Sequence, residues 1–168
     1  GESAVVIGLG LIGQLVCQIL LSSGIKVIGI DGMEERLSFA KSKGVAYSFS
    51  SQRKNLIEEI IALTNSYGAD ATIICASNPQ DNNIINEAMQ LTRKRGKVVV
   101  VGDIGLKIER TYWYEKEIDL RISTSYGPGR GDPAYEIEGK DYPYAYVRWT
   151  ENRNMEAYLE LLANKKID

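Results

Sequence analysis

The chain has 168 residues, of which 44% are hydrophobic and 25% charged, as is usual for one globular domain with its own core. Its net charge of −2 gives no long-range attraction for nucleic acid or an anionic membrane, so we expect neither as a partner. It contains no histidine, which excludes histidine acid–base catalysis and histidine metal ligands within this chain.

The first apolar stretch, 4–21, is interrupted by three glycines and Gln14, and no basic region precedes it. We therefore expect neither a transmembrane span nor a signal peptide, and we expect a cytoplasmic location. The two cysteines, Cys17 and Cys75, lie far apart in apolar runs, which indicates core residues rather than a disulfide or a metal site. Since the chain begins directly before a strand and ends just after a helix, we expect it to be part of a longer protein.

Short β-branched runs alternate with helical patterns along the chain. The expected strands are 4–7, 26–30, 45–49, 70–75, 97–101 and 120–125, and the expected helices are 11–22, 33–43, 54–67, 81–95 and 154–163. Nearly continuous apolar strands indicate a parallel sheet with helices on both faces. We predict an α/β Rossmann fold, a doubly wound parallel sheet of six strands in the order 3-2-1-4-5-6.

One segment, 126–149, breaks this alternation because it is rich in tyrosine, proline and glycine. We expect an irregular loop there, and so long a loop is commonly functional or faces a partner. Docking against a missing part of the protein is a simpler explanation than a ligand surface. We interpret 1–168 as one domain that carries this Tyr/Pro-rich insert.

The strongest motif is Gly8-Leu9-Gly10-Leu11-Ile12-Gly13, a GxGxxG pattern between the first expected strand and helix. Gly8 permits a tight turn, Gly10 lets a pyrophosphate approach the backbone, and Gly13 lets the helix pack on the strand. The free N–H groups and positive dipole of the helix N-terminus bind the pyrophosphate without a basic side chain. A merely structural glycine turn is the competing explanation.

The second half of this fingerprint is Asp31, which ends the second expected strand 23 residues after Gly8. A carboxylate there accepts hydrogen bonds from the adenosine ribose and repels a 2′-phosphate, so we expect NAD rather than NADP. The competing explanation is a solvated turn aspartate beside Gly32. Arg36 is placed to reach the ribose or a phosphate, although an arginine in a first helical turn is more often only solvated.

Ligands of doubly wound sheets bind at the carboxyl ends of the strands, so the residues that end the later strands are weaker candidates for the cofactor groove. Packing at the strand ends is an equally good explanation for each of them. These candidates are Cys75, Ala76 and Ser77, then Val101, Gly102 and Asp103, and, for the nicotinamide end, Thr124, Ser125 and Tyr126.

The sequence resembles the coenzyme-binding domain of the medium-chain (zinc-type) alcohol and threonine dehydrogenase superfamily over nearly its whole length. The segments that carry the resemblance are 6–13, Asp31 with Arg36 and Ala40, 44–45, 68–70, 96–102 and 159–168. In that family a catalytic domain similar to the GroES fold, absent here, supplies the zinc ligands where zinc is used. The resemblance implies that Arg36 contacts the adenosine ribose and that a homodimer forms through the edge of the sixth strand, 120–125.

The insert departs from simple alcohol dehydrogenases. It is similar to a branch in which this domain is fused to a second domain of the glucose-fructose oxidoreductase type, whose bacterial members are associated with surface-polysaccharide metabolism. That likeness implies a sugar or sugar-nucleotide substrate rather than a simple alcohol.

The expected function is cofactor binding in an oxidoreductase that transfers a hydride between NAD and an alcohol or sugar hydroxyl carbon of a small-molecule substrate. The catalytic base and any zinc belong to the absent domain, so the isolated chain should bind NAD without turnover. Three alternatives remain: a nucleotide-sugar dehydrogenase NAD domain, an S-adenosylmethionine methyltransferase, and a non-catalytic NAD-sensing module.

Overall fold

The computed structural model describes all residues, 1–168, and it divides the chain into two compact units. The first unit is Gly1–Ile122 and the second is Ser123–Asp168. No helix in either unit is both long enough and apolar enough to cross a membrane.

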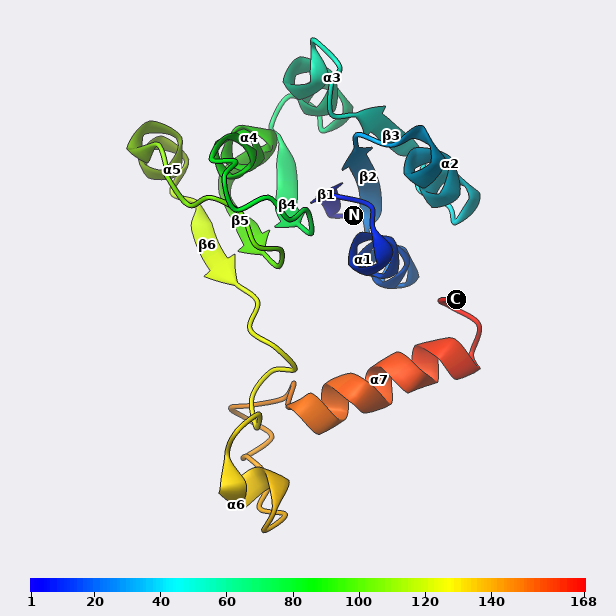
Figure 1. Cartoon of the computed structure of the whole chain (residues 1–168), viewed down its shortest axis with the longest axis vertical. Helices are drawn as coiled ribbons and strands as arrows, with labels where there is room; N and C mark the ends of the chain where they lie inside the picture. Colours follow the sequence, from blue (N-terminus) through cyan, green and yellow to red (C-terminus); the bar gives the residue numbers. More distant parts are fainter. The chain divides into compact units, whose positions relative to one another are not determined.

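The first unit is built on one sheet of six parallel strands (Figure 1). Its order is β3-β2-β1-β4-β5-β6, which confirms the predicted Rossmann topology. The strands are β1 (Ser3–Ile7), β2 (Lys26–Asp31), β3 (Tyr47–Ser50), β4 (Ala69–Ile74), β5 (Thr92–Val100) and β6 (Asp119–Ile122). Because all pairs are parallel, the carboxyl ends of the strands share one edge of the sheet.

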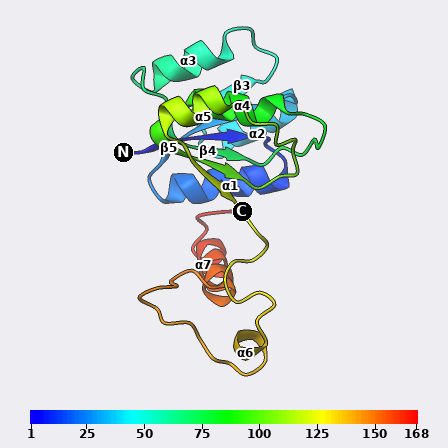
Figure 2. The same cartoon turned by 90° about the vertical axis from the view of Figure 1, so that its left-hand side faces the viewer.

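Helices cover both faces of this sheet, as Figure 2 shows. On one face, α1 (Leu11–Ser22) and α2 (Glu34–Ser42) close a small core with β1 and β2. On the other, α3 (Leu56–Leu63), α4 (Asn83–Leu91) and α5 (Arg110–Lys116) pack over a larger core that includes fully buried Ile60, Ile85 and Met89. Burial on both faces explains why the central strands are apolar without alternation.

Two predicted helices of this unit were too long. The helix expected at 81–95 ends at Leu91, because Thr92 turns into an extended conformation and starts β5 opposite Ala69. The buried Thr92 hydroxyl donates to the carbonyl of Ala88 and meets the Thr72 hydroxyl at 2.7 Å. The helix expected at 54–67 runs only from 56 to 63, because residues 65 and 66 adopt left-handed backbone angles.

One helix, α5, was not predicted. Its sequence, RTYWYEK, has no apolar stripe, and none of its residues is buried. Side-chain hydrogen bonds fix it instead. The Trp113 indole N–H donates to the carbonyl of Ile118 over 2.9 Å, and the Lys116 ammonium donates to the carbonyls of Met89, Gln90 and Thr92. The helix ends at Lys116, because the next residue, Glu117, has a left-handed φ of +51°.

The second unit contains α6 (Pro133–Glu136) and α7 (Glu151–Ala163). The expectation of a structureless 126–149 was wrong, because Asp132 caps the turn of α6 by accepting the N–H of Ala134. The last helix begins at Glu151 rather than at 154, since the Thr150 hydroxyl accepts the N–H of Arg153. The strand predicted for 120–125 likewise ends at Ile122, within the first unit.

Candidate functional site

The turn after β1 requires glycine at two positions. Gly8 has φ of +89°, and a Cβ there would lie 2.4 Å from the backbone nitrogen of Ala76. A Cβ on Gly13 would lie 1.9 Å from the carbonyl oxygen of Gly8, so α1 packs on the turn without room for a side chain. These contacts bear out the turning and packing roles expected of the first and third glycines.

Gly10 differs from both, because a Cβ there would meet nothing within 4 Å. The space in front of it is open, at the residue that caps α1. No side chain caps this helix, and its first turn holds no acidic residue. The N–H groups of Leu11 and Ile12 make no hydrogen bond to the rest of the chain. The side chains of these two residues are 80% and 54% exposed, respectively, which leaves an uncovered apolar surface beside the free N–H groups.

Asp31 ends β2 beside this turn and is 93% buried, its exposed fraction being 7%. Its Oδ2 accepts the N–H of Leu9 at 2.7 Å and its Oδ1 accepts the N–H of Met33 at 2.9 Å. The Arg36 guanidinium lies 3.4 Å from Oδ2 and is about half exposed. The carboxylate is therefore held in place by the glycine turn and by the start of α2, and it is not a freely solvated turn residue. Its neighbour Gly32 is exposed.

The ends of β4 and β5 meet the glycine turn. The N–H of Ala76 donates to the carbonyl of Ile7 at 2.9 Å, and Ala76 lies against Gly8 on one side. On its other side is Gly102, where a Cβ would be 1.9 Å from the Ala76 carbonyl oxygen. The N–H of Cys75 also donates to Ile7, and those of Val101 and Gly102 donate to the carbonyl of Ile74.

Ser77 and Asp103 lie at the same ends and are exposed, and the Ser77 hydroxyl donates to the Asp103 carbonyl at 3.3 Å. The structure thus brings the predicted residues of four strand ends to one edge. The predicted nicotinamide-end residues Thr124, Ser125 and Tyr126 belong to the second unit, so their part in the site stays a prediction.

The sequence analysis missed a residue that the structure places inside this edge. Gln14, the residue after the third glycine, is buried, and its side-chain amide donates to two carbonyls of the site, those of Leu9 and Arg36. A polar residue directly after the glycine motif, inside an apolar helix, was the available signal.

A zinc site does not fit the residues of this chain. No group of three or more cysteine, aspartate or glutamate side chains is placed to hold a metal ion, and histidine is absent. Burial raises the pKa of the Cys17 thiol to about 12, with a further rise from nearby Cys75. Burial also raises the pKa of Cys75 to about 11. Both thiols therefore remain protonated at neutral pH, in keeping with the predicted core role.

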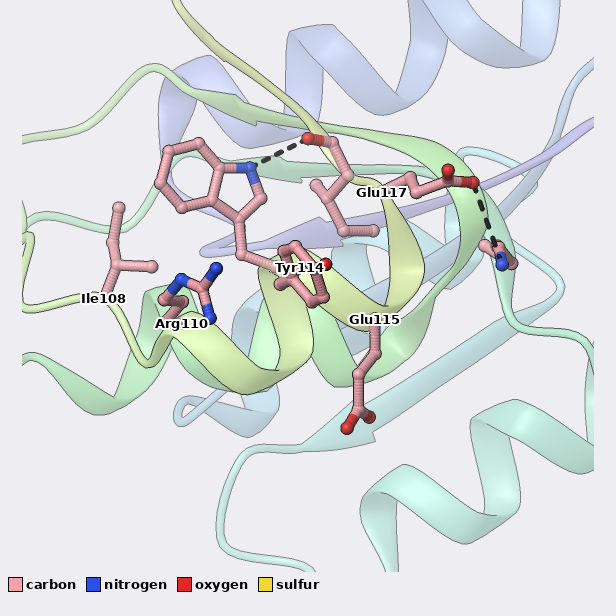
Figure 3. A pocket seen from close by; sticks show the side chains of 8 residues that line it. Ile108, Arg110, Tyr114, Glu115 and Glu117 are labelled. Atoms are coloured by element: carbon pink, nitrogen blue, oxygen red, sulfur yellow. Dashed lines mark hydrogen bonds and ion pairs between the residues drawn. The ribbon is translucent and has the colours of Figure 1, made fainter.

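The first unit also has a pocket of about 730 Å³ beside α5, drawn in Figure 3. None of the predicted coenzyme residues lines it. Arg110 stacks on the ring of Tyr114 at one wall, and the Lys94–Glu117 ion pair closes another. This pocket is separate from the glycine turn and forms no part of the candidate site.

Comparisons with known proteins agree with this geometry. Residues 12–138 match the zinc-binding dehydrogenase family. A sorbitol dehydrogenase of Halalkalibacterium halodurans is 31% identical over 144 residues, which are 82% of this chain and 40% of that protein. The chain therefore spans about two fifths of the length of this relative.

Two solved structures share the fold. An Escherichia coli alcohol dehydrogenase in complex with NADH superposes with a TM-score of 0.71 and 20% identity, over 100% of this chain and 42% of that one. A mycobacterial protein in complex with NADPH gives a TM-score of 0.73 and 13% identity, over 99% of this chain and 48% of that one.

A Rossmann sheet with a glycine turn and a buried aspartate at its carboxyl edge is the architecture of a dinucleotide-binding domain. More specifically, the chain belongs to the zinc-binding dehydrogenase family and corresponds to the coenzyme-binding domain of its medium-chain alcohol dehydrogenases.

Proposed function

We propose that this chain binds NAD at the carboxyl edge of its sheet and holds the coenzyme for hydride transfer to or from a substrate carbon. The observation that carries this proposal is the contrast among the three glycines: two are packed against backbone, whereas the third faces open space at an uncapped helix N-terminus. Such a cradle fits a pyrophosphate, which the free N–H groups of Leu11 and Ile12 would bind.

The preference for NAD over NADP is part of the proposal. Asp31 is fixed beside the position where the adenosine ribose of a bound dinucleotide would lie. Its Oδ1 accepts only the N–H of Met33 and so keeps lone-pair capacity for a ribose hydroxyl. A 2′-phosphate would bring a second anion against this buried carboxylate. The cation beside this carboxylate is Arg36, and its guanidinium is already paired with Asp31.

The nicotinamide, when bound, supplies the hydride acceptor or donor. The chain's own contribution is to bind the dinucleotide, fix its orientation and exclude water from its pyrophosphate. Catalytic base and zinc would come from residues outside this chain. For the substrate we propose an alcohol or sugar hydroxyl, in line with the polyol named for the sorbitol dehydrogenase relative.

Assembly and location complete the proposal. The outer edge of β6 has no partner strand, and its Ile122 is 71% exposed, so we propose a homodimer formed by pairing this edge with that of a second copy. We propose a cytoplasmic location, in keeping with an intracellular pool of nicotinamide coenzyme.

The structure offers no observation that favours the alternative functions. The expected mark of a methyltransferase is an antiparallel last strand, whereas β6 runs parallel to β5. Neither a nucleotide-sugar dehydrogenase nor a sensing domain is favoured by the family match.

Calorimetric titration with NADH, NADPH and S-adenosylmethionine tests the proposal. We expect NADH to bind most tightly, and Asp31→Ala to weaken it at least tenfold, about the value of hydrogen bonds to a charged group. Gly10→Val should abolish binding by filling the cradle. Asp119→Ala, at the amino end of β6, is the matched control and should bind as the unaltered chain does. Binding of S-adenosylmethionine alone, or of none of the three, would contradict the proposal.

A further inference from the structure

Gln14 makes two hydrogen bonds that join separate parts of the coenzyme site. Its Nε2 donates to the carbonyl of Leu9 at 3.0 Å, in the glycine turn, and to the carbonyl of Arg36 at 2.9 Å, in the first turn of α2. We call this pair of hydrogen bonds the Gln14 brace. The side chain is 8% exposed, so solvent competes little for these bonds.

The other end of the same amide is unsatisfied. The Gln14 Oε1 is buried and has no hydrogen-bond partner. A buried acceptor without a partner costs about 1–3 kcal/mol. Exchanging the positions of Oε1 and Nε2 by rotating the amide would not remove this cost, because Oε1 would then face two carbonyl oxygens. An apolar side chain would avoid this cost, so the position is explained by what Nε2 does rather than by packing.

The brace connects the same two segments as Asp31. The Leu9 peptide gives its N–H to Asp31 and its carbonyl to Gln14. At the start of α2, the N–H of Met33 goes to Asp31 and the carbonyl of Arg36 goes to Gln14. Two side chains thus fix the glycine turn against the helix that carries Arg36.

We infer that Gln14 is a positioning residue of the coenzyme site, which sets the selection of NAD over NADP by holding Arg36 against Asp31. The inference rests on the proposed function. With the brace in place, the Arg36 guanidinium stays 3.4 Å from Asp31 and the carboxylate faces the ribose position. Without it, the first turn of α2 shifts more freely and Arg36 becomes available to a 2′-phosphate.

The test compares Gln14→Met with Gln18→Met in the 168-residue chain. Gln18 is the matched control, because it is the same residue type in the same helix, one turn further on, and is equally buried. Each variant is titrated with NADH and with NADPH, and its unfolding is measured. Both substitutions should lower stability, whereas only the Gln14 variant should change coenzyme selection.

For Gln14→Met we expect NADH affinity to fall about tenfold, because the glycine turn and the start of α2 are no longer held in the geometry that binds the coenzyme. The ratio of NADPH to NADH dissociation constants should fall about threefold or more, since Arg36 is released. For Gln18→Met both quantities should equal those of the unaltered chain. Equal effects of the two variants on affinity and ratio would overturn the inference, because a merely structural role moves stability alone.

A second measurement keeps the inference falsifiable where Gln14→Met does not fold. In the unaltered chain, the side-chain amide protons of Gln14 should exchange slowly and should shift on NADH addition in NMR spectra. The side-chain amide protons of Gln18 should not shift. Gln14 side-chain amide signals that do not change on NADH addition would overturn the inference. The proposed function and the positioning role of Gln14 can fail separately. If the unaltered chain does not bind NADH, the proposed function is wrong. If NADH binds but the Gln14 amide signals do not change, only the positioning role is wrong.

Discussion

The two units of this chain are stabilised in different ways. The first buries a continuous set of aliphatic side chains on both faces of its sheet, including fully buried Val5, Ile28 and Met89. In the second, neither α6 nor α7 has a buried residue. Side-chain hydrogen bonds hold it instead, such as Tyr135 to Thr150 at 2.8 Å.

Arg153 provides the same kind of support in the second unit, where it donates to the carbonyls of Val147 and Arg148 and pairs with Asp141. Each unit is therefore sensitive to a different kind of substitution. Loss of packing should unfold the first, whereas loss of single polar contacts should loosen the second.

The largest effect is expected from Gly13→Ala in the first unit. The added Cβ would lie 1.9 Å from the Gly8 carbonyl, so α1 must separate from the sheet. We expect a loss of about 3 kcal/mol or more in the free energy of unfolding, measured by urea denaturation. Gly10→Ala is the control, because its Cβ meets open space, and it should cost less than about 1 kcal/mol. Equal losses would refute the packing argument.

Each unit contains a methionine, so the same replacement by alanine can be made in both and the losses of stability compared. Met89 is fully buried in the larger core, whereas Met155 on α7 is 52% exposed. Met89→Ala should destabilise the first unit by about 2–5 kcal/mol. Met155→Ala should change stability by no more than about 0.5 kcal/mol. A large loss at Met155 would show that α7 is covered, and would remove the contrast.

The polar support of the second unit is tested by Tyr135→Phe. This change removes the hydroxyl that donates to Thr150, the residue that caps α7. Losing about 1 kcal/mol should speed amide exchange at the start of α7 roughly fivefold. Exchange in β1 and β4 should not change. Unaltered exchange in α7 would mean that this hydroxyl does not support the cap.

The smallest effect concerns pH. The Tyr142 hydroxyl, and then the N–H of Ala134, donate to Asp132 and lower the pKa of its carboxyl below the ordinary value of 3.8. The ionised form is thus favoured in the folded state, so its stabilisation is complete above that ordinary value and is lost as pH falls through the lowered one. We expect amide protection around α6 to decrease below about pH 4. Asp132→Asn should remove this dependence, and an unchanged pH profile would contradict the assignment.

Regular burial made most of the first unit predictable. The apolar runs predicted all six strands and their order, and the glycine motif predicted which backbone contacts exclude a side chain. Asp31 followed from its place at the end of a strand. These features depend on local pattern and on the handedness of parallel connections, which the sequence displays directly.

The remaining features depend on contacts between distant residues. The start of β5 is decided by Thr92 meeting Thr72, and α5 is held by the side-chain hydrogen bonds of Trp113 and Lys116. Likewise, Gln14 becomes part of the site only because the fold brings the Arg36 carbonyl within 2.9 Å of its amide. Sequence periodicity does not predict such contacts between distant residues.

NMR of the backbone amides while NADH is added to the unaltered chain shows directly whether the glycine turn binds the coenzyme. We expect the largest shifts at Leu11 and Ile12, whose N–H groups lack partners, with smaller ones at Asp31 and Gly102. Residues around the α5 pocket should not respond. Shifts confined to that pocket, or none at saturating NADH, would contradict the claim that the glycine turn binds the coenzyme.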